Sequence, residues 1–232
     1  MNGSRGAGRV VHSPLPVVIL ISGRGSNMQA IIDKTRSGEL PVEIRAVISN
    51  RPDAAGLKLA DLAGLETRVI DHTEYADRET FDRALQACID SYRPGLVVLA
   101  GFMRILTPGF VHHYQGRMLN IHPSLLPEFP GLNTHQRAID AGKREHGASV
   151  HFVSEDIDGG PVLLQARVPV REGDNADLLS ERVLREEHRL FPLAIRWFAE
   201  GRIFLDENGR IRMDEEPLDQ PALLPADLTA PC

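Results

Sequence analysis

The fold is decided by residues 17–27, which read Val-Val-Ile-Leu-Ile-Ser-Gly-Arg-Gly-Ser-Asn. The apolar run 17–21, bounded by Ser22-Gly23, is typical of a strand that is buried on both faces. A helical pattern follows the Gly-rich turn, from Asn27 to Thr35. A buried strand that leads through a turn into a helix is the first part of a βαβ unit, so the stretch predicts an α/β fold.

The same alternation continues through most of the chain. Further strands are predicted at residues 42–48, 67–70, 96–100, 117–121, 149–153 and 162–170. Further helices are predicted at 54–63, 78–92, 135–141 and 175–199, and Pro192 is expected to kink the last of them. The sequence therefore predicts a mostly parallel sheet flanked by helices, with right-handed crossovers.

The two ends of the chain differ from the middle. Residues 1–13 are rich in Gly, Ser and Arg and are expected to be a disordered leader. Residues 202–205 and 210–213 flank Asn208-Gly209, which predicts a C-terminal β-hairpin. From Glu215 on the chain is Pro-rich, and we expect a tail without required structure. The predicted organisation is a leader at 1–13, a single domain at 14–214 and a tail at 215–232.

Composition limits the possible functions. The chain has 232 residues, a net charge of −6 and a pI near 5.8, and 5% of its residues are aromatic. An acidic chain with few aromatic side chains does not suit nucleic-acid binding. Its cysteines, Cys88 and Cys232, cannot form a disulfide framework, and no signal peptide or membrane-spanning apolar stretch is expected. These features indicate a reducing, cytoplasmic setting without a membrane partner.

The Gly-rich turn is the first candidate site. In an open parallel sheet, ligands bind at the carboxyl ends of strands, and the amides at a helix N-terminus attract phosphate. Gly23 and Gly25 would allow a close backbone approach, and Ser26 and Asn27 could add hydrogen-bond donors. Met28 stands where the third Gly of a dinucleotide fingerprint belongs, and no Gly-Lys-Ser/Thr follows. The spacing fits phosphate binding and an ordinary strand-to-helix turn equally well.

A second candidate site combines three polar side chains at predicted strand ends and loops. Asn120 and His122 lie two residues apart at a strand end, so both can face the same side. An amide donor could polarise a carbonyl, and an imidazole offers a proton near neutral pH. Asp158 precedes two glycines on a tight loop, where a carboxylate near His122 would orient the ring and favour its protonated form. From spacing alone, a structural Asn and His at a turn and an Asx turn at Asp158 remain alternatives.

Two further features of the sequence are candidate ligand-binding groups. The histidines at 122, 135, 146 and 151 match no usual zinc spacing, and no cysteine is nearby, so no metal site is expected. Glu187 interrupts the apolar stripe of the helix predicted at 175–199, where a carboxylate needs a partner. That partner could be an ammonium or hydroxyl group of a ligand, or a nearby arginine.

Four motifs, taken in order, resemble those of the phosphoribosylglycinamide formyltransferases of purine synthesis. They are residues 21–27, residues 99–106 (Leu-Ala-Gly-Phe-Met-Arg-Ile-Leu), residues 120–127 (Asn-Ile-His-Pro-Ser-Leu-Leu-Pro), and residues 146–152 (His-Gly-Ala-Ser-Val-His-Phe) leading to 158–161 (Asp-Gly-Gly-Pro). The match extends from about Val17 to Arg202, and the combination in this order is highly specific. Ser-Leu-Leu-Pro alone marks the wider formyltransferase group. The fold implied is a Rossmann-like sheet whose N-terminal half binds phosphate and whose C-terminal half binds folate.

The resemblance also implies an activity and the residues that carry it. The activity is transfer of a formyl group from the co-substrate 10-formyltetrahydrofolate to the amine of glycinamide ribonucleotide, without a metal. The implied catalytic residues are Asn120, His122 and Asp158. The implied ribonucleotide-binding residues are Gly25, Ser26, Asn27 and Glu187. The implied folate-binding residues are Arg78, Met103, Arg104, Ile105, Leu106, Asn120, Ser154 and Ile157. One departure is Asn133, where some relatives have His, and formation of a homodimer is left open.

Three other functions fit parts of the pattern. A methionyl-tRNA formyltransferase should have a further C-terminal domain and a basic surface, whereas about 30 residues follow the long helix here and the net charge is −6. A formyltetrahydrofolate hydrolase carries a regulatory domain before the shared core, and about 13 residues precede the first strand here. A non-catalytic folate or nucleotide sensor would be expected to lack Asn120, His122 or Asp158.

Overall fold

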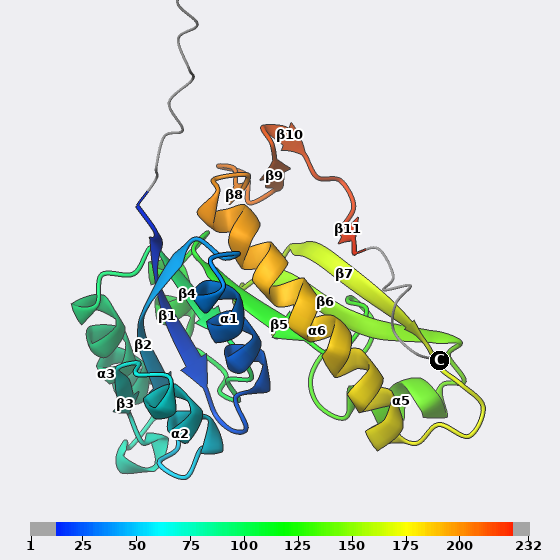
Figure 1. Ribbon diagram of the computed structural model, residues 1–232, viewed down its shortest axis with the longest axis horizontal. Helices are drawn as coiled ribbons and strands as arrows, with labels where there is room; N and C mark the ends of the chain where they lie inside the picture. Colours follow the sequence, from blue (N-terminus) through cyan, green and yellow to red (C-terminus); the bar gives the residue numbers. More distant parts are fainter. Residues whose placement is uncertain (1–12, 225–232) are drawn as a thin grey trace, which may run out of the picture.

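A central eight-stranded sheet carries helices on both faces in the computed structural model, which describes residues 13–224 (Figure 1). The strands are β1 (Leu15–Ile21), β2 (Val42–Ser49), β3 (Thr67–Val69), β4 (Leu96–Leu99), β5 (Met118–His122), β6 (Glu145–Phe152), β7 (Val162–Pro169), β8 (Ile203–Leu205), β9 (Ile211–Met213), β10 (Glu216–Pro217) and β11 (Ala222–Leu223). The helices are α1 (Ser26–Arg36), α2 (Ala55–Leu62), the 3₁₀ helix η1 (His72–Glu74), α3 (Arg78–Ser91), α4 (Pro108–His113), α5 (Thr134–Asp140) and α6 (Ala176–Ala199).

The large sheet is mostly parallel. Its strand order is β11-β7-β6-β5-β4-β1-β2-β3, and the five strands from β1 to β5 are parallel. β6 is antiparallel to both β5 and β7, and β11 is parallel to β7. A smaller antiparallel sheet, β10-β9-β8, contains the hairpin predicted at Asn208-Gly209. The predicted fold class and the C-terminal hairpin are therefore confirmed.

Strand β1 shows why its sequence is a continuous apolar run. Val17, Ile19 and Ile21 belong to the core that includes α1 and α6, whereas Val18 and Leu20 belong to the core that includes α3 and α4. All five side chains are fully buried. Because successive side chains of a strand point to opposite faces, a strand covered on both sides needs an apolar residue at every position.

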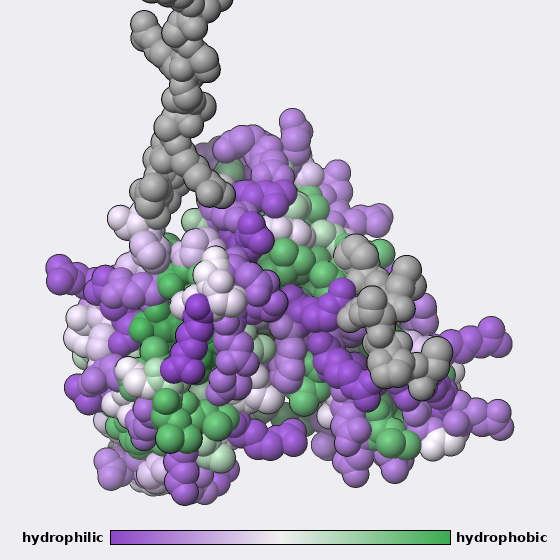
Figure 2. Space-filling view, in the orientation of Figure 1, coloured by the Kyte–Doolittle hydropathy of each residue, from purple (hydrophilic) through white to green (hydrophobic). Residues whose placement is uncertain are grey.

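The longest helix, α6, lies beside α1 on one face of the sheet and contacts β6 and β7 (Figure 1). It continues through Pro192 rather than ending there. The outer surface over these two helices is largely hydrophilic, and its apolar areas are separate from one another (Figure 2). Among residues 13–224, no helix combines the length and the apolar character needed to cross a membrane.

The expectation of a tail without structure is wrong for its first part. β10 pairs with β9, and β11 pairs with β7 to become the edge strand of the large sheet, where the Leu224 amide also donates to the Gln165 carbonyl at 2.8 Å. These pairings use backbone groups, so they need no apolar pattern in the sequence. Residues 1–12 and 225–232, which include most of the predicted leader and the rest of the tail, lie outside the described residues.

Other elements also differ from the prediction, and the short 3₁₀ helix η1 is one that was not predicted. Helix α4 was not predicted, although Thr107 caps it by accepting from the Phe110 amide and Pro108 occupies its first turn. β6 begins at Glu145 rather than Ser149, because pairing with β7 extends through Gly147. A Cβ at Gly147 would lie 1.9 Å from the Ala166 carbonyl oxygen, so glycine is required by the close approach of the two strands.

Candidate active site

The loops that follow β1 and β4 are joined at the carboxyl edge of the parallel strands. The Ser22 amide donates to the Gly101 carbonyl at 3.1 Å, and the Ser22 hydroxyl accepts from the Met103 amide at 2.7 Å. The same hydroxyl donates to Asn50 Oδ1 at 2.5 Å. β5 lies next to β4 and ends at His122, so all three loops open at the edge where parallel sheets bind ligands.

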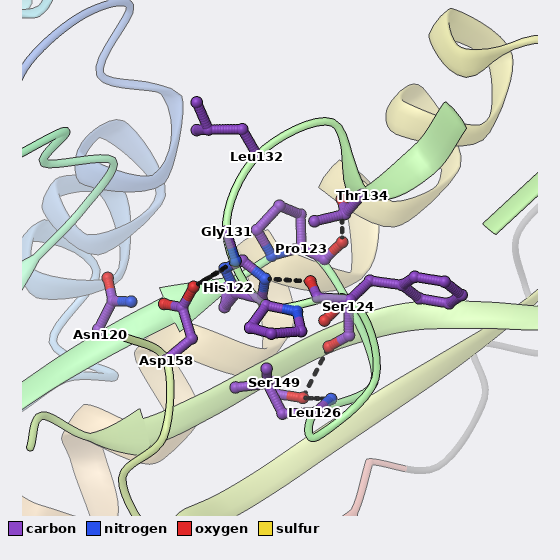
Figure 3. A network of polar contacts seen from close by, with 12 residues as sticks. Asn120, His122, Pro123, Ser124, Leu126, Gly131, Leu132, Thr134, Ser149 and Asp158 are labelled. Atoms are coloured by element: carbon purple, nitrogen blue, oxygen red, sulfur yellow. Dashed lines mark hydrogen bonds and ion pairs between the residues drawn. The ribbon is translucent and has the colours of Figure 1, made fainter. Parts of the chain in front are cut away.

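Asn120, His122 and Asp158 come together at this edge (Figure 3). Asp158 lies in the loop between β6 and β7, and its Oδ2 is 3.4 Å from His122 Nδ1. The other ring nitrogen, Nε2, is 2.9 Å from the Phe129 carbonyl oxygen, which can only accept. Both ring nitrogens therefore face oxygen acceptors.

The carboxylate of Asp158 is not used for an Asx turn. Its Oδ2 accepts at 2.8 Å from the Gly131 amide, which comes from the loop after β5. Asp158 has a left-handed backbone with φ of +53°, and the following turn brings the chain so close that a Cβ at Gly160 would lie 1.9 Å from the Phe152 carbonyl oxygen. The tight loop thus presents the carboxylate to His122 rather than to its own backbone.

His151 is a fourth member of this cluster that the sequence did not single out, except as a metal-ligand candidate. It lies opposite Asn120 in the β5–β6 register, and Asn120 Nδ2 is 3.0 Å from His151 Nε2. Its Nδ1 is 2.9 Å from the Phe152 carbonyl oxygen, and burial lowers its pKa. The ring is therefore neutral with its proton on Nδ1, so its Nε2 accepts from the Asn120 amide and fixes which way that amide points.

The other two histidines of the 122–151 segment pack together rather than joining this cluster. The rings of His135 and His146 meet edge to face with centroids 5.2 Å apart. Within residues 13–224, no group of three or more His, Cys, Asp or Glu side chains is arranged to hold a metal ion.

The Gly-rich turn has the geometry of a close backbone approach. Gly25 is the N-cap of α1 with φ of +76°, and a Cβ there would lie 2.8 Å from the Gly56 Cα at the start of α2. The Gly56 amide donates to the Gly23 carbonyl at 2.9 Å. Since no side chain caps α1, the first amides of the helix, which include those of Ser26 and Asn27, remain available to an anion.

Glu187 finds its protein partner on α1. The Asn27 side-chain amide donates to Glu187 Oε2 at 2.6 Å, and both side chains are buried. Burial raises the pKa of Glu187, while the Asn27 hydrogen bond and the charge of Arg24 oppose that shift. The carboxylate thus joins α6 to the first turn of α1, and the buried Asn27 Oδ1 has no hydrogen-bond partner within the described part of the chain.

A cavity of about 470 Å³ lies beside the same turn. Its lining includes Arg24 and Ser26 from the turn, Lys34 from α1 and His188 from α6. Burial lowers the pKa of His188. The lining contains none of Asn120, His122 and Asp158, so the cavity borders residues that the resemblance implies for ribonucleotide binding rather than the second cluster.

The residues implied for folate binding include unusually exposed apolar side chains. Met103, Ile105 and Ile157 are 68%, 52% and 56% exposed, whereas Leu106 is buried. Exposed large apolar groups beside a polar cluster are typical of a ligand-binding surface. The remaining implied residues occupy neighbouring loops and helix starts: Arg104 stacks over the Phe81 ring, Arg78 begins α3, and Ser154 donates to the Asp156 carbonyl.

The departure at Asn133 has a local explanation. Asn133 is the N-cap of α5 and has a left-handed backbone with φ of +57°. Asparagine tolerates this conformation better than most residues, so the residue suits its position in the turn.

Comparisons with known proteins show the family to which the chain belongs. A family model described as formyl transferase matches residues 15–195, and the chain belongs to that family. It is 54% identical over 193 residues to the phosphoribosylglycinamide formyltransferase of Escherichia coli. The aligned region covers 83% of this chain and 91% of that relative. It is also 49% identical over 195 residues to the human trifunctional purine biosynthetic protein adenosine-3, of which it covers 19%.

A solved structure gives the same result. The phosphoribosylglycinamide formyltransferase of Coxiella burnetii aligns with a TM-score of 0.88 at 51% identity, covering 91% of this chain and 100% of that chain. The resemblance inferred from the four motifs is confirmed. Membership of the family implies a folate-derived formyl donor.

Proposed function

We propose that this chain transfers the formyl group of 10-formyltetrahydrofolate to the amine of glycinamide ribonucleotide, in purine biosynthesis. The observation that carries the proposal is the cluster of Asn120, His122 and Asp158 in a chain 54% identical to a phosphoribosylglycinamide formyltransferase. In this mechanism Asn120 supplies the amide donor, His122 the acid and Asp158 the carboxylate.

In the proposed reaction, the substrate amine attacks the formyl carbon and negative charge develops on the formyl oxygen. Asn120 and protonated His122 stabilise that oxygen, and one such donor is typically worth about 10²–10³ in rate. Asp158 keeps His122 protonated and helps to move a proton from the attacking amine to the leaving N10 of the folate. Attack forms the new C–N bond in a tetrahedral intermediate, and the old bond to N10 breaks as that intermediate collapses, so no covalent enzyme intermediate or metal is required.

The binding residues divide between the two halves of the sheet. The amides at Gly25, Ser26 and Asn27 hold the phosphate of the ribonucleotide, and Glu187 accepts from its hydroxyl or ammonium groups. The exposed apolar side chains at Met103, Ile105 and Ile157 cover the folate ring system, with Arg104 and Leu106 beside them. Direct transfer between two bound substrates makes positioning a large part of the rate enhancement.

The test is an assay of the purified chain with both substrates. We expect formation of formylglycinamide ribonucleotide and deformylated folate in equal amounts, with no loss of turnover in EDTA. Release of formate without the ribonucleotide would instead favour the hydrolase alternative, and formylation of methionyl-tRNA would favour the tRNA enzyme. Absence of product with the ribonucleotide, under conditions in which both substrates bind, would overturn the proposal.

A further inference from the structure

A buried polar junction lies behind the loop that follows β5. At its centre is the Ser149 hydroxyl on β6, which is fully buried. It donates to the Ser124 carbonyl at 2.7 Å and accepts from the Leu126 amide at 3.0 Å, as Figure 3 shows. Its remaining lone pair accepts from Gln165 Nε2 at 2.9 Å, so every hydrogen-bonding position of the hydroxyl is used.

Gln165 completes the junction from the next strand. It lies on β7 opposite Ser149, and it is 7% exposed. Its Nε2 also donates to the Leu126 carbonyl at 2.8 Å, so the two hydrogens of one amide nitrogen reach the loop and the hydroxyl that holds it. The backbone of Gln165 is itself paired on both sides, to β6 and to β11.

The outer side of the same loop contacts the reactive groups. The Phe129 carbonyl accepts from His122 Nε2, and the Gly131 amide donates to Asp158 Oδ2. A second set of contacts keeps the loop compact: the Ser124 hydroxyl donates to the Glu128 carbonyl, and the Thr134 hydroxyl donates to the Pro123 carbonyl, each at 2.6 Å. Gln165 and Ser149 therefore hold the inner side of a loop whose outer side orients His122 and Asp158.

We propose that Gln165 is a positioning residue for formyl transfer: by holding Leu126 and Ser149, it fixes the Phe129 carbonyl and the Gly131 amide against His122 and Asp158. The inference rests on the proposed function. Its neighbours on β7, Leu163 and Leu164, are fully buried and apolar, so a polar side chain at 165 is costly unless its hydrogen bonds are made. Those bonds go to the catalytic loop and to the serine that holds it.

The first experiment uses Gln165→Met, which keeps much of the length and volume but removes both donors. The matched control is Leu163→Val, a change in a fully buried side chain on the same strand that makes none of the hydrogen bonds of this junction. We expect Gln165→Met to reduce kcat about 10–100-fold, since small misplacements of reacting groups have effects of this size. KM for both substrates should change less than about threefold, and the acid limb of the kcat–pH profile should move. The control should keep kcat within about threefold and leave the profile unchanged, even at equal loss of Tm.

Several outcomes would overturn the proposal. They are normal turnover in Gln165→Met, an unchanged pH profile, or an equal kcat loss in a control variant of the same Tm. If Gln165→Met does not fold, Ser149→Ala removes the same junction from β6 and must give the same kcat loss and profile shift.

A separate readout distinguishes this proposal from the proposed function. If the wild-type chain transfers no formyl group, the proposed function fails, and the imidazole ¹⁵N resonances of His122 are then compared in the wild type and Gln165→Met. A change in those resonances supports the positioning contact. Resonances that are identical to those of the wild type overturn it.

Discussion

The turn before α1 and the loop after β5 lie at the same edge of the sheet, yet different contacts hold them. Close backbone packing of Gly25 against Gly56 holds the turn, and the Ser22 hydroxyl joins it to Asn50 and to the Met103 amide. One buried side-chain pair, Asn27 with Glu187, joins the first turn of α1 to α6. The side chains of Ser149 and Gln165 hold the loop after β5 on its inner side, through the Leu126 amide and carbonyl. Two of its backbone groups, the Phe129 carbonyl and the Gly131 amide, contact His122 and Asp158 and orient them.

Because of this difference, we expect changes in the turn and changes in the loop to affect different kinetic parameters. In the turn, backbone amides remain available to a ligand, so changes there should act mainly on the KM of the ribonucleotide. In the loop, backbone groups orient the reacting side chains, so changes there should act mainly on kcat. The following variants test this division, beginning with the largest expected effect.

The largest effect is expected from breaking the His122–Asp158 pair. His122→Ala and Asp158→Asn should each reduce kcat by about 10²–10⁴-fold, the usual contribution of a positioned acid or base. Because the two groups act as one unit, the double variant should be scarcely worse than either single variant. Steady-state kinetics of all four proteins, with both KM values, provide the double-mutant cycle. Additive losses would contradict the coupled pair, and near-normal turnover of His122→Ala would remove the ring from the chemistry.

A smaller effect, on binding, is expected from Glu187→Gln. Loss of the charge should raise the KM of the ribonucleotide about tenfold, equivalent to about 1.4 kcal/mol, while the KM of the folate and kcat change little. The neutral amide can still accept from Asn27, so the fold should be kept. An equal rise in the KM of both substrates would contradict the assignment of Glu187 to the ribonucleotide.

Glu187→Gln should weaken ribonucleotide binding, but it should stabilise the fold at high pH. Burial raises the pKa of Glu187 above its ordinary value near 4.5, so the folded state binds the proton more tightly than the unfolded state. The stability that this carboxyl contributes is present below pH 4.5 and is lost as the pH rises through the folded pKa. Glu187→Gln should therefore have a higher Tm than the wild type at pH 8, and the difference should shrink toward pH 4. Thermal melts across this range check the sign.

The smallest effect is expected within the Gly-rich turn, from Gly25→Ala compared with Gly23→Ala. An alanine at Gly25 is strained by its left-handed backbone, which costs about 1–2 kcal/mol, or roughly 2–8 °C in Tm, and its Cβ meets the Gly56 backbone. The KM of the ribonucleotide should rise a few-fold, equivalent to less than about 1.4 kcal/mol, without a change for the folate. The control position, Gly23, has no atom within 4 Å of an added Cβ. Equal effects at the two positions would show that the contact with Gly56 is unimportant.

Much of the fold could be predicted because its strands are buried on both faces. The apolar run 17–21 and the run 96–100 had to be covered by helices on each side, which requires the alternating order of an α/β chain. The missed strand β11 and the earlier start of β6 depend on other information. β11 is held by backbone pairing to an exposed edge, and β6 includes a glycine that only the approach of β7 explains.

The sequence by itself determined which chemical groups are present and that they lie at strand ends or on loops: an amide, an imidazole and a carboxylate at 120, 122 and 158, and a glycine turn before a helix. Only the tertiary structure decided which of them meet. Asn120 contacts His151, Gln165 reaches Leu126, and Asn27 donates to Glu187, pairs that are 31, 39 and 160 residues apart. The β5–β6 register and the packing of α6 beside α1 set these contacts. Apolar periodicity shows which face of an element is buried, but it carries no information about the element that covers it.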